Sequence, residues 1–130
     1  MSGFSDYLED KVLEHVFGGN AFTAPSSLHV ALFTSAPSDT GGGTEVSGGS
    51  YARQTATFNV SGTNPTTAPN AAAVEYPTAT ADYGTVVAVG IFDASSSGNL
   101  LAYANLTASK TVSSGDVFRF DAGDIDITLA

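Results

Sequence analysis

The sequence predicts a mainly β fold, an antiparallel β-sandwich or jelly-roll-like domain with one N-terminal amphipathic α-helix. Three observations support this prediction. Helical periodicity is confined to residues 3–17, and later apolar residues alternate or form short solid runs. Segments rich in Gly, Ser, Asn and Pro separate these runs. Charged residues make up only 13% of the chain, so its polar surface must consist largely of Ser, Thr, Asn and Gly, which is typical of hydroxyl-rich strands.

The helix is predicted over residues 3–17. Ser2 or Ser5 can cap its beginning, and Gly18 and Gly19 can end it. Its apolar residues recur at helical spacing and form one stripe: Phe4, Leu8, Val12, Leu13, Val16 and Phe17. A single helix of this length buries little by itself, so the stripe must lie on the sheet that follows or on another subunit.

The β-sandwich is predicted over residues 27–130, and it begins with a buried strand at residues 28–34. Residues 36–50 contain five glycines and are predicted to form a flexible, solvent-facing loop. Another loop is predicted over residues 61–70, because two prolines exclude a central strand there.

Residues 51–60 lie between these loops, and their alternation predicts a half-buried strand. Its predicted inner face consists of Ala52, Ala56, Phe58 and Val60, and its outer face of Arg53, Thr55, Thr57 and Asn59.

The last third of the chain has the clearest strand pattern. Residues 85–93 are almost entirely apolar and predict a central strand, in which Gly90 marks a bulge or a close approach. Further strands are predicted at residues 71–76, 100–106, 110–112, 117–120 and 124–130. We find no linker that divides the sequence, which predicts a single domain over residues 1–130.

The final strand carries Asp124 and Asp126 on one face and Ile125 and Ile127 on the other. Asp121 and Asp116 could bring further oxygens, but the spacing matches no calcium loop. We interpret the carboxylates as the solvated face of an edge strand, where charge also discourages unwanted sheet extension. No metal or cofactor is expected.

No catalytic residues are expected either. His15 lies near the end of the helix and His29 interrupts a buried strand, where a hydrogen-bonded core histidine is more common than a ligand. The sequence has no G-x-S-x-G nucleophile elbow, and its glycine clusters lack the Lys-Ser/Thr of a phosphate-binding loop.

Composition also limits the partners. The chain has 4 basic and 13 acidic residues, a net charge of −9, so binding to nucleic acid or to an anionic membrane surface is not expected. It has no cysteine, which excludes disulfides and thiolate zinc sites. No apolar run approaches the roughly 20 residues that a membrane span requires.

Four stretches together resemble small virion proteins of tailed bacteriophages that are described as tail fibre proteins. They are "FSDYLEDKVLEHVFGG", "APSSLHVALFTSAPSD", "SYARQTATF" and "GIFDASSSGNLLAYANLTASKTVSSGDVFRFDAGDIDITL". The resemblance implies a non-enzymatic structural component of the virion, tail-fibre-like or tail-associated, which is assembled in the host cytoplasm. Its implied partners are other virion proteins and copies of itself.

Two other functions stay open at this stage, capsid decoration on the head exterior and binding of a host-surface glycan. The chain has no Trp to form a sugar platform, and beyond the helix only Tyr51, Tyr76, Tyr83 and Tyr103 could replace it.

Candidate interface residues are Phe4, Leu8 and Val12 on the helix, and Tyr51 and Arg53 on the predicted outer strand face. Arg119 is a further contact candidate, although a scattered cation more often pairs with a nearby carboxylate.

Overall fold

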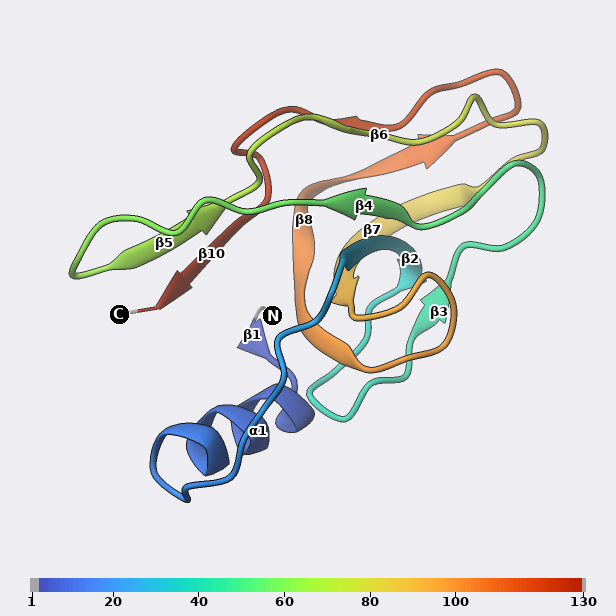
Figure 1. Ribbon diagram of the computed structural model, residues 1–130. Helices are drawn as coiled ribbons and strands as arrows, with labels where there is room; N and C mark the ends of the chain where they lie inside the picture. The colour runs from blue at the N-terminus through green and yellow to red at the C-terminus, as the bar shows by residue number, and fades with distance from the viewer. Residues whose placement is uncertain (1–2, 130) are drawn as a thin grey trace.

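The computed structural model describes residues 3–129 and has antiparallel sheets with one short N-terminal helix, which confirms the predicted fold class (Figure 1). In chain order the elements are β1 Gly3–Phe4, α1 Asp6–Val16, β2 Leu28–Ser35, β3 Thr44–Glu45, β4 Gln54–Ala56, β5 Thr66–Pro69, β6 Val74–Glu75, β7 Gly84–Phe92, β8 Leu100–Val112, β9 Arg119–Phe120 and β10 Asp126–Leu129.

The largest sheet has six strands in the order β1-β8-β7-β2-β3, with β4 also paired to β2. Strand β7 lies between β8 and β2, as its solid apolar run predicts. Gly90 of β7 pairs with Ala31 on one side and with Tyr103 on the other. The predicted close approach at Gly90 is confirmed, because a Cβ atom there would lie 2.8 Å from Phe33 Cε1 and 3.0 Å from Leu100 Cδ1.

Two small sheets, β5–β10 and β6–β9, form the second layer. The main core lies between the layers: Val30 and Leu32 of β2 belong to the same buried cluster as Val74 and Phe118. Tyr76 is 1% exposed and its hydroxyl donates a 2.7 Å hydrogen bond to the carbonyl of Val30, so a polar contact also joins the two layers.

The opposite face of the large sheet has a smaller buried cluster of Ala31, Phe33 and Ala88. Phe92 stacks on Phe33 with 6.1 Å between the ring centroids. Because β2 is covered on both faces, its residues cannot alternate between apolar and polar, which explains the solid apolar run at residues 28–34.

The helix begins at Asp6, three residues later than predicted, because Gly3–Phe4 form β1 and pair with β8. Ser5 is the N-cap: its Oγ accepts a 3.2 Å hydrogen bond from the backbone N–H of Leu8. Ser2 lies outside the described residues. The helix ends at Val16, shortly before the two predicted stop glycines.

Two predicted loops contain strands. Within residues 36–50, β3 pairs with β2, and Val46 is buried and donates from its N–H to the carbonyl of Leu32. The prediction of a solvent-facing loop is confirmed for most of these residues, which are exposed, but it is wrong for the short strand β3 and for Val46. Within residues 61–70, β5 pairs with β10 and includes Pro69, which an edge strand tolerates. Strands of two to four residues are too short to produce a recognisable period.

The predicted strand at residues 51–60 is shorter than expected. Only Gln54–Ala56 pair with β2, as strand β4. Phe58 packs against the main core as predicted, but the inward position of Val60 is wrong, because its side chain is 73% exposed.

Among the described residues, no helix is both long and apolar enough to cross a membrane.

Replacement of Gly90 by Ala tests the close packing around Gly90 on the sheet face that carries Phe33 and Phe92. We expect G90A to lower the free energy of unfolding by about 1–3 kcal/mol, because the added methyl group overlaps Phe33 and Leu100. Urea unfolding measures this difference. Gly3→Ala is the matched control, since a Cβ at Gly3 has no atom within 4 Å and should leave stability nearly unchanged. Equal stability of G90A and wild type would contradict the described packing.

Candidate functional site

An ion pair between the largely buried side chain of Arg53 and the half-buried Glu45 joins separate segments of the chain. Arg53 donates from Nη2 to Glu45 Oε1 at 2.8 Å and from Nε to Oε2 at 2.9 Å, a bidentate contact. Its Nη1 donates to the backbone carbonyls of Ala94 and Ser97, both at 2.9 Å. The guanidinium carbon lies 3.8 Å from the ring centroid of Phe92. Arg53 thus holds strand β3 and the turn after β7 together.

The outward position predicted for Arg53 is wrong, since its side chain is only 7% exposed. The alternation fails because Arg53 precedes the first paired residue of β4, Gln54, and so is not held in the strand's two-residue period. The alternative that it pairs with a local carboxylate is confirmed.

Tyr51 completes this cluster. Its hydroxyl donates to Glu45 Oε2 at 2.7 Å and accepts from the N–H of Leu32 at 3.0 Å. Burial raises the pKa of Glu45, but hydrogen bonds from Arg53 and Tyr51 and the charge of Arg53 outweigh it, and the pKa lies below its ordinary value. Burial and the hydrogen bond to Glu45 raise the pKa of Tyr51. The cluster presents no group that is available for chemistry, because the carboxylate of Glu45 and the guanidinium of Arg53 are hydrogen-bonded to each other.

The tyrosines considered for a sugar platform lie in the interior. Tyr76, Tyr83 and Tyr103 are buried, and Tyr51 is half-buried and stacks on Tyr76 with 6.0 Å between the ring centroids. None of these rings presents an open face of the kind on which a sugar stacks.

Helix α1 contributes an exposed apolar surface. No residue of α1 is buried, and the exposed fractions are 59% for Leu13, 61% for Val16 and 82% for the C-cap residue Phe17. Val12, a predicted interface residue, is 37% exposed and lies on the same helix. We call Val12, Leu13, Val16 and Phe17 the helix surface. Of the two alternatives for the stripe, packing on this chain's own sheet is not seen for these four side chains, because none of them belongs to either core cluster or packs against one.

The other predicted helix contacts, Phe4 and Leu8, are half-buried. Phe4 lies in β1 and packs against the main core. Ser5, between β1 and α1, fixes the direction of the helix, since its N–H donates to the carbonyl of Leu101 and its hydroxyl to that of Leu100. Helix α1 therefore has a fixed direction and lies to one side of the sheets, next to β1 (Figure 1).

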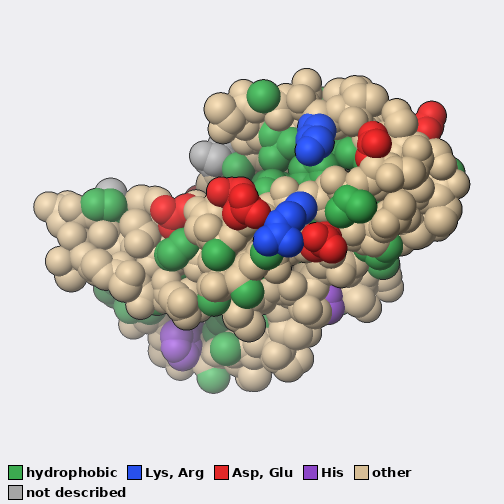
Figure 2. Space-filling view, turned by 90° about the horizontal axis from the view of Figure 1, so that it is seen from above, with side chains coloured by type: hydrophobic (Ala, Val, Ile, Leu, Met, Phe, Trp, Pro, Cys, Tyr) green, Lys and Arg blue, Asp and Glu red, His purple; other side chains and the backbone are tan. Residues whose placement is uncertain are grey.

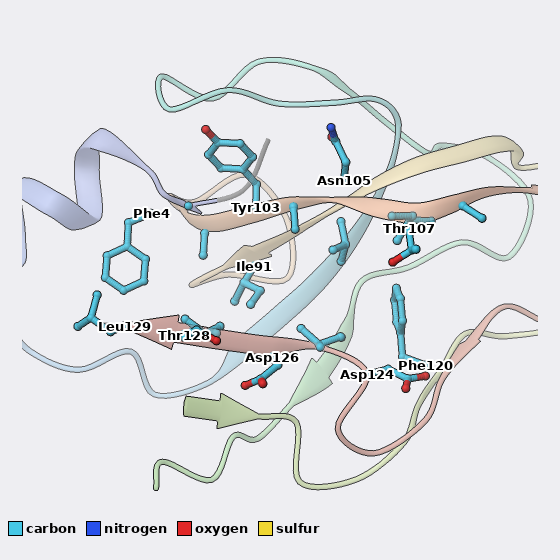
Figure 3. A pocket seen from close by; sticks show the side chains of 18 of the residues that line it. Phe4, Ile91, Tyr103, Asn105, Thr107, Phe120, Asp124, Asp126, Thr128 and Leu129 are labelled. Atoms are coloured by element: carbon cyan, nitrogen blue, oxygen red, sulfur yellow. The ribbon is translucent and has the colours of Figure 1, made fainter. Parts of the chain in front are cut away.

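A groove of about 750 Å³ separates β8 from β10 (Figure 3). Phe4, Ile91 and Phe120 point into it, whereas the side chain of Tyr103 points away (Figure 3). Its lining includes consecutive residues 102–108 and 124–129. Because side chains alternate along a strand, consecutive lining residues indicate that backbone atoms of both strands also border the groove. No sequence signal indicated it, because it arises from the spacing of two strands that are distant in the chain.

The carboxylates of the last strand are solvated, as interpreted from the sequence: Asp124 and Asp126 are exposed. Asp124 accepts a 2.9 Å hydrogen bond from the N–H of Asp121, whose own carboxylate accepts from Arg119 at 2.8 Å. Within residues 3–129, no three His, Cys, Asp or Glu side chains are arranged to hold a metal ion.

Arg119 makes two exposed ion pairs, to Glu75 at 3.1 Å and to Asp121 at 2.8 Å. Figure 2 looks onto the β6 side of the molecule and shows basic side chains next to acidic ones rather than gathered in a basic patch.

The histidines lie apart from each other. His15 accepts from the N–H of Phe22 through Nδ1 at 3.2 Å. His29 is buried, as predicted for a core histidine, and its Nε2 lies 2.9 Å from Ser27 Oγ. Its Nδ1 has no partner among the described residues.

The geometry is that of a small β-rich domain with an exposed apolar helix surface and a polar cluster in which Arg53, Glu45 and Tyr51 bind one another. The sequence matches the family model "Podophage GP4 fiber I protein gp80" over residues 3–128. The chain belongs to this family and is a phage tail fibre protein, a component of the virion. This assignment decides against capsid decoration. A search of curated proteins found no match.

Replacement of Glu45 by Gln tests the buried ion pair. We expect E45Q to lower the free energy of unfolding by about 2–3 kcal/mol, because it leaves the guanidinium of Arg53 without a counter-charge. The loss is smaller than for a fully buried pair, since the side chain of Glu45 is 26% exposed to solvent. Chemical denaturation measures the loss. Glu75→Gln breaks an exposed pair and should cost no more than about 1 kcal/mol. Equal losses in the two variants would refute the special role of the buried pair.

Acidification provides a second test of the same contact. Because the pKa of Glu45 is lowered by folding, its ionised form stabilises the protein above the ordinary value of 4.5, and this contribution disappears as pH falls through the folded pKa. The stability difference between wild type and E45Q should therefore narrow below pH 4.5. Unfolding curves across acidic pH measure it, and a constant difference would contradict the lowered pKa.

Proposed function

We propose that this fibre protein is a non-enzymatic structural component that attaches to another virion protein through the helix surface. The observation that carries the proposal is the exposure of Leu13, Val16 and Phe17 on a helix whose direction Ser5 fixes. A contiguous group of large apolar side chains in water is unfavourable and is typical of a protein–protein contact. The family description as a fibre protein supports the non-enzymatic role.

Charge favours a different protein over a second copy of the same helix. Helix α1 carries Asp6, Glu9, Asp10 and Glu14 against Lys11. Two such helices placed face to face would bring like charges together at the rim of the contact. A partner with an apolar centre and basic margins avoids this repulsion and gains attraction instead.

The five residues singled out from the sequence take different parts in this proposal. Val12 contributes to the contact directly. Phe4 and Leu8 support the base of the helix, and Tyr51 and Arg53 stabilise the sheet that carries it.

Polar replacement of the helix surface tests the proposal. We expect the double variant Leu13→Ser, Phe17→Ser to keep its stability within about 1 kcal/mol, because both side chains are largely exposed, and to be lost from the particle. Particles are purified from infected cells that supply the variant, and mass spectrometry measures its copy number relative to the capsid protein.

Val60→Ser is the matched control, since Val60 is 73% exposed and belongs to the loop before β5 rather than to α1. It should be incorporated like wild type. Normal incorporation of the double variant would refute attachment through the helix surface.

A further inference from the structure

The groove between β8 and β10 has the features of a site for an added strand. Strand β10 pairs with β5 along Asp126–Leu129, and its other edge has no strand partner within residues 3–129. Strand β8 pairs with β7 along one edge, and along the other the described part of the chain pairs with it as a strand only at Ala102 and Tyr103, through β1. The two unpaired edges border the same groove, and an unpaired edge offers backbone donors and acceptors for a further strand.

Strand β1 already occupies one end of this groove in the same way. Its residues Gly3 and Phe4 pair antiparallel with Tyr103 and Ala102 of β8. The ring of Phe4 points into the groove (Figure 3). An extended segment with alternating apolar residues can therefore pair with an edge and place its side chains between the layers.

The second layer has room for a further strand beside β10. The β5–β10 ribbon has two strands of four residues each, and a two-stranded ribbon is only marginally stable by itself. Ile127 is half-buried and Leu129 is 60% exposed, although both line the groove. A third strand would cover these side chains and use the unpaired edge of β10.

The charges at the groove indicate the chemistry of the occupant. Glu9, Asp124 and Asp126 line it, against the single cation Lys110. A matching segment therefore carries Lys or Arg next to its apolar residues.

A second copy has no such segment to offer, because the chain has four basic residues and they occur singly. Arg53 and Arg119 are engaged in ion pairs, Lys11 lies in α1 and Lys110 already lines the groove.

We propose that an extended, basic segment of a different virion protein, apolar at alternate positions, binds in this groove as a β-strand between β8 and β10. This contact is separate from the helix surface and does not depend on the proposed role of that surface.

A short peptide in which Val alternates with Thr, with Lys at both ends, is the probe for binding. We expect it to shift backbone amide signals of residues 102–108 and 124–129 in NMR spectra, and to bind more weakly as salt is added. The same peptide with Glu at both ends, and a version with Pro in place of the central Val, should not bind at equal concentration. No binding of the Lys peptide, or shifts confined to other residues, would overturn the proposal.

Two charge-reversal variants locate the contact. Asp126→Lys should weaken binding of the Lys peptide roughly tenfold, because one attractive charge becomes repulsive. Asp10→Lys changes an exposed carboxylate of α1 outside the groove lining and should bind as wild type does. The Leu13→Ser, Phe17→Ser variant should also bind the peptide, which separates failure at this groove from failure at the helix surface. Equal affinity of D126K and wild type would overturn the assignment.

Cross-linking in assembled particles identifies the source of the segment. The chain has no cysteine, so Thr128→Cys introduces a single attachment point at the groove for a cross-linking reagent. Mass spectrometry should find residue 128 joined to a different virion protein. A cross-link to another copy of this chain, or none in particles that contain the variant, would overturn the proposal.

Discussion

The contact between Arg53 and Glu45 is the interaction on which the arrangement of the large sheet depends. The carboxylate belongs to β3 and the guanidinium to the segment before β4. The guanidinium also donates to two backbone carbonyls in the turn after β7, those of Ala94 and Ser97. Tyr51 extends the same cluster to the backbone of β2. A buried guanidinium is costly unless all of these partners are in place, so the ion pair helps to set the relative positions of these segments. Because the cost of removing both charges from water offsets most of their attraction, such a pair contributes more to the arrangement of these segments than to the free energy of unfolding.

The sequence was most informative where burial is one-sided or complete over many residues. The solid run of β7, the close approach at Gly90 and the end of the helix just before Gly18 follow from periodicity and backbone conformation, and the structure has all three. It was least informative for β3 and β5, whose two and four residues produce no period. The position of Arg53 was mispredicted for a related reason: alternation extends only as far as the ladder, and the ladder of β4 begins at Gln54.

The two interaction surfaces differ in how far the sequence could predict them. An amphipathic stripe must be covered by something, so the sequence predicted either the sheet or another subunit, and the exposure of Leu13 and Phe17 favours the second. The groove between β8 and β10 depends on the separation of two layers, and no local pattern encodes that distance. Its acidic lining was visible as the alternation of Asp124 and Asp126, but the same alternation fits any solvated edge.

The junction at Ser5 has a mechanical consequence for a fibre protein. The residue is 2% exposed and binds two successive carbonyls of β8, directly between a two-residue strand and the first turn of α1. A force applied to the helix is transmitted to β8 through these hydrogen bonds, because no flexible segment separates Ser5 from the first turn of α1. If α1 is the attached element, the sheets would therefore move together with it as one rigid body, and the orientation of α1 would set the orientation of the whole domain on the particle.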